Sequence, residues 1–171
     1  SLAHLKRPCI AVVGTRRCSQ YGKKTAFLLA KELAAMGFIV VSGLARGIDT
    51  KAHQGALQTG MTYAILGSGL NQVYPPENRQ LAAKIAEQGA VITSYPLEKP
   101  PYKTNFPARN RIISGLSLGT IVVEAPTKSG ALITANCSLR QGREVFAVPG
   151  DINRSQSAGT NDLIKSGAKL V

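Results

Sequence analysis

Cys9-Ile10-Ala11-Val12-Val13-Gly14 is a short apolar run that ends at a glycine. Over residues 21–36, apolar side chains recur every three or four positions, as they do along the buried face of an α-helix. Gly37 ends this helix, and Phe38-Ile39-Val40-Val41 is a second apolar run, followed by Ser42-Gly43. The pattern predicts a strand, a loop, an amphipathic helix and a second buried strand.

The same alternation continues to the end of the chain. Further strands are predicted at residues 62–66, 90–93, 119–123 and 144–148, of which the last is the final strand. Helices are predicted at residues 48–58, 79–88, 106–117, 132–140 and 161–166, with loops at 94–104 and 151–160. Strands that alternate with helices form a parallel sheet covered on both faces. We therefore expect one α/β domain over residues 1–171, with three layers and a mostly parallel central sheet.

Composition favours a folded protein that binds a polyanion. The chain has 171 residues, 44% of them hydrophobic, which is enough for one domain with a substantial core. Its 21 Lys and Arg outnumber its 9 Asp and Glu, and the net charge is +12. The cations are spread through the ordered pattern, not gathered in a tail, so a basic folded surface is expected. Nucleic acid is the leading class of partner.

Membrane, metal and cofactor signals are missing from the sequence. No apolar run approaches the ~20 residues that span a bilayer, and no signal-peptide core is seen, so a cytoplasmic protein is expected. Cys9, Cys18 and Cys137 are odd in number and lack Cys-x-x-Cys spacing, which favours reduced thiols and no structural metal. Neither a dinucleotide fingerprint nor a Walker loop is present, so no nucleotide cofactor is expected.

A basic helix with an arginine on its packed side is predicted at Phe106-Pro-Ala-Arg-Asn-Arg-Ile-Ile-Ser-Gly-Leu-Ser117. Asn105 can cap its first turn, and Pro107 suits a position whose amide would lack a partner. At about 100° per residue, one face carries Phe106, Arg109, Ile112, Ile113 and Leu116. Arg111 points almost the opposite way.

Arg109 therefore needs a partner, because a buried guanidinium without one is costly. An internal ion pair is one interpretation. The other is a phosphate clamp at the helix start, with Lys103 close by and Phe106 able to stack on a base. The sequence leaves both interpretations open.

Ligands of such sheets bind beyond the carboxyl ends of the strands. That rule selects the loops at residues 14–17, 42–47, 67–69 and 124–130, which carry glycines, hydroxyls and cations. Each glycine alone is better explained as a turn former, but their repetition favours phosphate binding by backbone amides. Asp49 is expected to hydrogen-bond the turn before it, and His53 to lie on a helix flank without a catalytic role.

An ordered set of motifs extends over nearly the whole chain. It consists of Gly14-Thr15-Arg16, Tyr21-Gly22, Ser42-Gly43-Leu-Ala-Arg-Gly-Ile-Asp49, Gly67-Ser68-Gly69, Tyr74-Pro75, Phe106 to Ile113, Val123-Glu124-Ala125, Ser129-Gly130, Ile133-Thr134-Ala135, Gly142-Arg143, Val145 to Gly150, Gly159-Thr160-Asn161 and Gly167-Ala168. This set resembles the Rossmann-like core of the DNA processing protein A (DprA/Smf) family. The resemblance implies a non-enzymatic, dimeric protein that binds single-stranded DNA. It also implies protection of incoming DNA during natural transformation and help in loading the recombinase RecA.

The resemblance also assigns roles to residues. Arg16 and Lys103 would contact phosphates, and Phe106 would stack on a base. Arg109, Asn110 and Arg111 would form the basic wall of the same pocket. Hydroxyl and backbone donors would come from Ser42, Gly43, Ser129 and Gly130. The N-terminal helical domain and the C-terminal winged-helix-like domain of many relatives are expected to be absent.

Two other functions remain open. Related Rossmann-like proteins hydrolyse nucleotides, and Glu124 could serve as the acid of such an enzyme. The chain lacks the Gly-Gly-x-Gly-Thr stretch that those enzymes use. The second alternative is a protein-interaction module whose basicity is incidental, which predicts weak, salt-insensitive association with DNA.

Overall fold

The computed structural model describes residues 7–171 and contains a seven-stranded parallel sheet within that range. The strands are β1 (Cys9–Val13), β2 (Ile39–Ser42), β3 (Thr62–Ile65), β4 (Ala90–Ile92), β5 (Gly119–Val122), β6 (Glu144–Ala147) and β7 (Lys169–Leu170). Their order across the sheet is β4-β3-β2-β1-β5-β6-β7. From β1 the chain forms β2, β3 and β4 in turn toward one edge of the sheet, then crosses back and forms β5 on the other side of β1. The order therefore reverses between β1 and β5.

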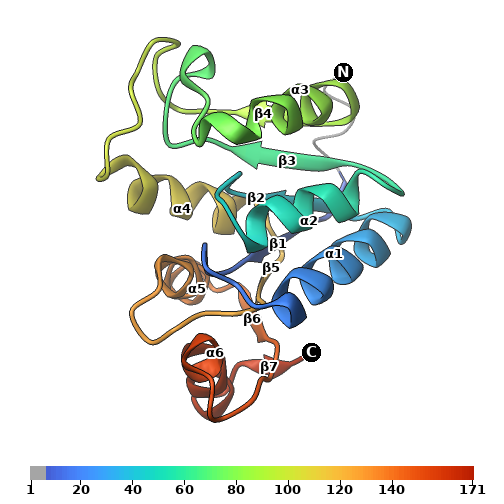
Figure 1. Ribbon diagram of the computed structural model, residues 1–171, viewed down its shortest axis with the longest axis vertical. Coiled ribbons are helices and arrows are strands. Elements are labelled where there is room, and N and C mark those ends of the chain that lie inside the picture. The colour runs from blue at the N-terminus through green and yellow to red at the C-terminus, as the bar shows by residue number, and fades with distance from the viewer. Residues whose placement is uncertain (1–6) are drawn as a thin grey trace.

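Helices cover both faces of the sheet, as predicted. They are α1 (Gln20–Ala35), α2 (Ile48–Ala56), α3 (Arg79–Gln88), α4 (Asn105–Leu116), α5 (Gly130–Arg140) and α6 (Ser155–Lys165), with short 3₁₀ turns η2 (Leu70–Gln72) and η3 (Pro76–Asn78). Alternate residues of the strands face opposite layers. Val12 and Val40 pack with the alanines of α1 and α2, whereas Val13 and Val41 pack with Ile113 of the α4 layer. Figure 1 shows α4 and α5 across the sheet from α1 and α2.

The helices α1 and α2 pack closely because small residues line their contact. Ala26 and Ala30 of α1 are fully buried against Ala52 and Ala56 of α2. At Gly55 the approach is closest, since a Cβ there would lie 2.1 Å from the carbonyl oxygen of Phe27. The N-terminal turns of both helices are thereby held near one another at the carboxyl edge of the sheet.

The C-terminal region differs from the prediction. The helix α6 begins at Ser155, six residues earlier than predicted, and β7 is a strand that the prediction lacked. The start of α6 has no apolar stripe because it reads Ser-Gln-Ser-Ala-Gly-Thr. It is stabilised by tertiary contact, with the Gly159 amide donating to the Ala125 carbonyl at 2.8 Å and Ser157 buried. Local propensity is weak enough for such contacts to override it.

The basic helix α4 is confirmed with two corrections. Asn105 is its first residue, not its cap, because Asn105 Nδ2 donates to the Gly67 carbonyl at 3.0 Å. Leu116 is 41% exposed, so the packed face ends before the last turn. Arg109 is buried and Arg111 is exposed, as the helical geometry predicts. Within residues 7–171, no helix is long and apolar enough to span a bilayer.

Candidate nucleic-acid interface

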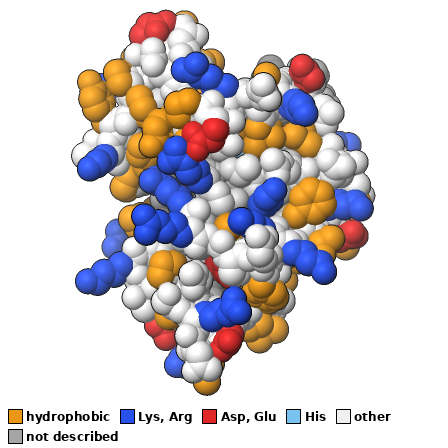
Figure 2. Space-filling model, in the orientation of Figure 1, with side chains coloured by type: hydrophobic (Ala, Val, Ile, Leu, Met, Phe, Trp, Pro, Cys, Tyr) orange, Lys and Arg blue, Asp and Glu red, His pale blue; other side chains and the backbone are white. Residues whose placement is uncertain are grey.

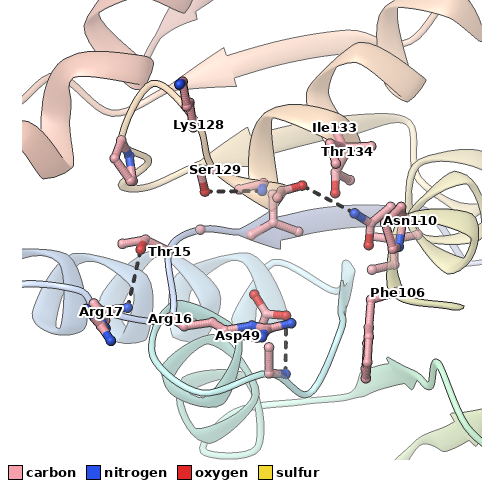
Figure 3. Close-up of a pocket in the computed structure, with 18 of the residues that line it drawn as sticks. Thr15, Arg16, Arg17, Asp49, Phe106, Asn110, Lys128, Ser129, Ile133 and Thr134 are labelled. Carbon is pink, nitrogen blue, oxygen red and sulfur yellow. Dashed lines mark hydrogen bonds between the residues drawn. The ribbon is translucent and has the colours of Figure 1, made fainter. Parts of the chain in front are cut away.

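A cleft of about 910 Å³ opens beyond the carboxyl ends of β1 and β5, where the strand order reverses. This is the place where sheets of this topology bind their ligands. The loops after β1, β2 and β5, the start of α4 and the start of α5 form its walls (Figure 3). Its lining includes Gly14, Thr15, Arg16, Arg17, Ala45, Asp49, Tyr74, Lys103, Phe106, Arg109, Asn110, Lys128, Ser129, Gly130, Thr134, Ser155 and Gln156.

One wall of the cleft is the N-terminus of α5. Ser129 caps this helix, and its hydroxyl accepts a hydrogen bond from the Ala131 amide at 3.3 Å. Gly130 is the first helical residue, so its amide has no partner within the helix. Asn110 Nδ2 donates to the Gly130 carbonyl at 3.3 Å and joins α4 to α5 across the cleft (Figure 3). An exposed Lys128 precedes this helix start, which favours anions.

The opposite wall is aromatic and cationic. The guanidinium carbons of Arg16 and Arg109 lie 5.6 Å and 5.9 Å from the centroid of the Phe106 ring. The Tyr74 ring lies 5.7 Å from Phe106, centroid to centroid, at an interplanar angle of 50°. Gly67 admits the Phe106 ring, because a Cβ at Gly67 would approach the ring to 2.8 Å. An aromatic face flanked by arginines suits a stacked base with a neighbouring phosphate.

Arg109 forms the floor between these walls and is only 4% exposed. Its Nη1 donates to the carbonyl of Gly43 at 2.7 Å and to that of Ile65, whereas Nε has no partner among the described residues. Burial lowers the pKa of Arg109 to about 10, and the charge of Asp49 works against that shift. The guanidinium is therefore protonated at neutral pH. The internal ion pair of the first interpretation is not formed, because no carboxylate of the described residues lies within 4.0 Å of the guanidinium and two backbone carbonyls bind it instead.

Asp49 holds the loop after β2, as the sequence predicts. Its Oδ2 accepts hydrogen bonds from the amides of Gly43 at 3.1 Å and Ala45 at 3.4 Å. Between these two residues, Leu44 has a φ of 58°, which is uncommon for any residue other than glycine. Asn78 donates to the Leu44 carbonyl at 2.8 Å and fixes the loop from the other side. Burial raises the pKa of Asp49, and the Arg109 charge opposes that shift.

The structure brings most of the predicted site residues together on the cleft lining. These are Arg16, Lys103, Phe106, Arg109, Asn110, Ser129 and Gly130. Gly43 lines a small adjoining hollow beside Arg16 and Phe106, but its amide donates to Asp49. Ser42 is fully buried, and its hydroxyl donates to the Val12 carbonyl at 2.7 Å. Arg111 lies on the exposed side of α4, away from the cleft lining.

Further residues of the lining were not assigned from the sequence. Arg17 and Lys128 belong to strand-end loops that the topology rule selects, so the rule could have found them. Gln156 could not be found, because its segment reads as a loop. Together, Arg16, Arg17, Lys103, Arg109 and Lys128 give the lining five cations, against the buried acid Asp49. Figure 2 shows Lys and Arg side chains gathered around a notch at the left, beside α4 and α5 of Figure 1.

His53 is fully buried in the structure, whereas a helix flank was predicted. Its Nδ1 lies 2.7 Å from Thr62 Oγ1, and that hydroxyl donates its own proton to the Val40 carbonyl. Nδ1 therefore carries the imidazole proton and donates. Burial, with the charge of Arg109 adding to it, lowers the pKa of His53 to about 3. The ring is neutral at physiological pH and serves the packing of α2 on the sheet.

Glu124 also has a structural environment. It is 2% exposed, and its carboxylate accepts hydrogen bonds from the amide of Ser19 at 2.8 Å and from the Ser19 hydroxyl. Ser19 is the N-cap of α1, and Glu124 is not on the cleft lining. The carboxylate from the end of β5 thus compensates the positive end of α1, which has no acid in its own first turn.

The fold and the cleft define a Rossmann-like α/β domain with a basic, aromatic cleft at the switch point of its sheet. The family described as DNA recombination-mediator protein A matches residues 1–171, and the chain belongs to this family. Protein Smf of Escherichia coli (strain K12) is 53% identical over 164 residues, covering 95% of this chain and 44% of that protein. The chain therefore spans about half the length of this curated relative.

Two solved structures have nearly the same fold. DNA processing protein A of Streptococcus pneumoniae superposes with a TM-score of 0.92 at 45% identity, over 100% of this chain and 60% of that one. DNA processing protein A of Helicobacter pylori, whose structure addresses its single-stranded DNA binding mode, has a TM-score of 0.92 at 34% identity. The similarity covers 99% of this chain and 78% of that chain.

Proposed function

We propose that this domain binds single-stranded DNA in the cleft. The observation that carries the proposal is Phe106, an aromatic ring of the cleft lining that has the guanidinium carbons of Arg16 and Arg109 at 5.6 Å and 5.9 Å from its centroid. A base stacks on the aromatic ring, and its neighbouring phosphates bind Arg16, Lys103 and the amides at the start of α5. Stacking is available only to unpaired bases, so the site prefers a single strand over a duplex. Membership of the family and the Helicobacter pylori relative support this substrate.

The wider role follows from the family. We infer that the protein acts in natural transformation, where it protects incoming single strands and helps to load RecA. We also infer a homodimer, which sedimentation across protein concentrations would test. The role is binding and not nucleotide hydrolysis. Supporting this, Glu124 has no place on the cleft lining and is engaged by the N-cap of α1.

Fluorescence anisotropy with a labelled single-stranded oligonucleotide, at several salt concentrations, tests the site. Each phosphate that a cation neutralises on a single strand contributes about −0.7 to the slope of log K against log salt. Arg16→Ala and Lys103→Ala are each expected to weaken binding and to reduce that slope by somewhat under one. Lys84→Ala, on α3 away from the cleft, is the matched control and should leave the slope unchanged.

Competition by an unlabelled duplex of the same sequence separates the remaining functions. A duplex that competes as well as the single strand would reduce the site to general affinity for polyanions. Weak binding without salt dependence would instead favour the protein-interaction module. Release of free base from a panel of nucleotides would favour the hydrolase.

A further inference from the structure

A second basic surface lies on the helices of the opposite layer, next to the cleft. Lys23 and Lys24 of α1 and Lys51 of α2 line one open hollow of about 430 Å³. We call it the lysine hollow, and its full lining is Gln20, Lys23, Lys24, Phe27, Leu28 and Lys51. Phe27 is partly buried and Leu28 is exposed, so the hollow has apolar as well as cationic walls.

Helix packing places the three lysines together. The alanines of α1 and α2, with Gly55, allow the two helices to approach until the backbone of α2 at Gly55 lies close to the backbone of α1 at Phe27. Lys23 and Lys51 each occupy the fourth position of their helix, so they meet at the end of the pair where both helices begin. Both helices follow adjacent parallel strands, and both starts lie at the edge of the sheet that carries the cleft.

The charges in the lysine hollow are not neutralised by the protein. Among the described residues, none of the three lysines has a carboxylate within 4.0 Å. Lys51 Nζ donates only to Gln54 Oε1, at 2.8 Å. Cations near the first turn also oppose the helix dipole, which favours negative charge there. Three unpaired lysines at that end of two adjacent helices are an unfavourable arrangement for stability alone.

A short segment of the chain connects the cleft with the lysine hollow. The exposed Arg16 and Arg17 line the cleft, and the chain then passes through Cys18 to the start of α1. Burial and the charge of Glu124 raise the pKa of the Cys18 thiol, and the charges of Lys23 and Lys51 oppose that shift, so both lysines lie within electrostatic range of this connection. Figure 2 shows Lys and Arg side chains at the notch and, separated from them by uncharged surface, further groups of Lys and Arg toward α1 and α2 of Figure 1.

We propose that a single strand bound in the cleft leaves it over Arg17 and continues across the lysine hollow, where Lys23, Lys24 and Lys51 bind its phosphates. This rests on the proposed function of the cleft and extends its footprint. The adjoining hollow between α1, α2 and α3 carries Glu77 and Glu87. Glu77 is paired with Arg46, and one lysine, Lys84, shares this lining, so the adjoining hollow offers phosphate one lysine against three in the lysine hollow. The apolar walls formed by Phe27 and Leu28 suit the sugar and base edges of the passing strand.

The test compares two lengths of single-stranded DNA on the triple variant K23A/K24A/K51A. A short oligonucleotide of about 6 nucleotides fills the cleft alone, whereas one of about 20 nucleotides also reaches the lysine hollow. The variant is expected to bind the short strand like the wild type. For the long strand, its slope of log K against log salt should be less steep by about 2, because three contacts of about 0.7 each are lost.

A control triple variant K31A/K84A/K165A removes the same charge elsewhere on the surface and should leave both strands unaffected. Equal weakening of short and long strands by K23A/K24A/K51A would show a general field effect and overturn the proposed path. An unchanged slope on the long strand would also overturn it. If the wild type fails to bind the short strand, the proposal that the cleft binds single-stranded DNA is wrong. These outcomes separate the two proposals.

Discussion

Phe106 joins the stacking and the ionic parts of the cleft, since both Arg16 and Arg109 lie over its ring. Phe106→Ala should weaken single-strand binding by roughly 1–3 kcal/mol, because one stacked base loses its platform. The salt slope should stay nearly unchanged, because no phosphate contact is removed. Anisotropy titrations at several salt concentrations measure both quantities on one variant.

Tyr102 provides the matched control for this substitution. It is a 54% exposed aromatic residue, lies outside the cleft lining and contacts Lys99 through its ring. Tyr102→Ala should leave binding unchanged. Equal losses in the two variants would show that Phe106 contributes no specific stacking. A flatter salt slope in Phe106→Ala would mean that the ring acts by positioning Arg16.

The burial of Arg109 was predictable, whereas its partners were not. Helical spacing alone puts this residue on the packed face of α4, because the angle per residue is fixed. The partners of its guanidinium are the carbonyls of Gly43 and Ile65. These carbonyls lie at the ends of β2 and β3, and only the assembled sheet brings them together. The buried position of Ser42 was missed for the same reason, since its hydroxyl partner, the Val12 carbonyl, is on another strand.

At the scale of elements, the start of α1 depends on a carboxylate from β5. Glu124→Gln keeps the size of the side chain but removes the charge and presents an amide donor to Ser19, which itself donates to both carboxylate oxygens. The free energy of unfolding should fall by roughly 1–3 kcal/mol, because a buried hydrogen bond is lost and a donor is left unpaired. Urea unfolding at neutral pH measures this change.

The same variant bears on the hydrolase alternative. If the role of Glu124 is structural, folded Glu124→Gln protein should bind single-stranded DNA at the cleft as the wild type does. An exposed acid on another helix, as in Glu87→Gln, serves as the control for stability. Unchanged stability in Glu124→Gln, together with a nucleotide-cleaving activity that the substitution abolishes, would contradict the structural role.

The elements that the sequence predicted well have strong hydrophobic periodicity. The helices α1, α2 and α3 and the strands β1 to β6 all begin and end within about two residues of the prediction. The helix α6 and the strand β7 lack such periodicity, because α6 begins with small polar residues and β7 is two residues long at the sheet edge. Their formation depends on contacts with the loop after β5 and with β6. Gln156 was missed in the site because it lies on this part of the fold.

At the scale of the whole molecule, a buried polar cluster joins α2, α4 and the sheet beneath the cleft. It contains Asp49, His53 and Arg109, and the imidazole of His53 is neutral at physiological pH. Its pKa of about 3 in the folded protein lies below its ordinary value of 6.5. Between these two values the unfolded chain binds a proton that the folded protein excludes. The contribution of His53 to the free energy of unfolding is therefore fully present above pH 6.5 and is lost as the pH falls toward 3.

Comparison of the wild type with His53→Gln isolates this contribution. The wild type should be the more stable protein at pH 7.5, because the imidazole fills its site and donates to Thr62. By pH 5 the difference in free energy of unfolding should narrow by about 2 kcal/mol, since each pH unit below 6.5 removes roughly 1.4 kcal/mol from the wild type alone. Burial raises the pKa of Asp49, so protonation of Asp49 stabilises the folded protein as the pH falls. This effect is present in both the wild type and His53→Gln. Urea unfolding at the two pH values measures the difference, and an equal difference at both would show that His53 titrates as it does in the unfolded chain.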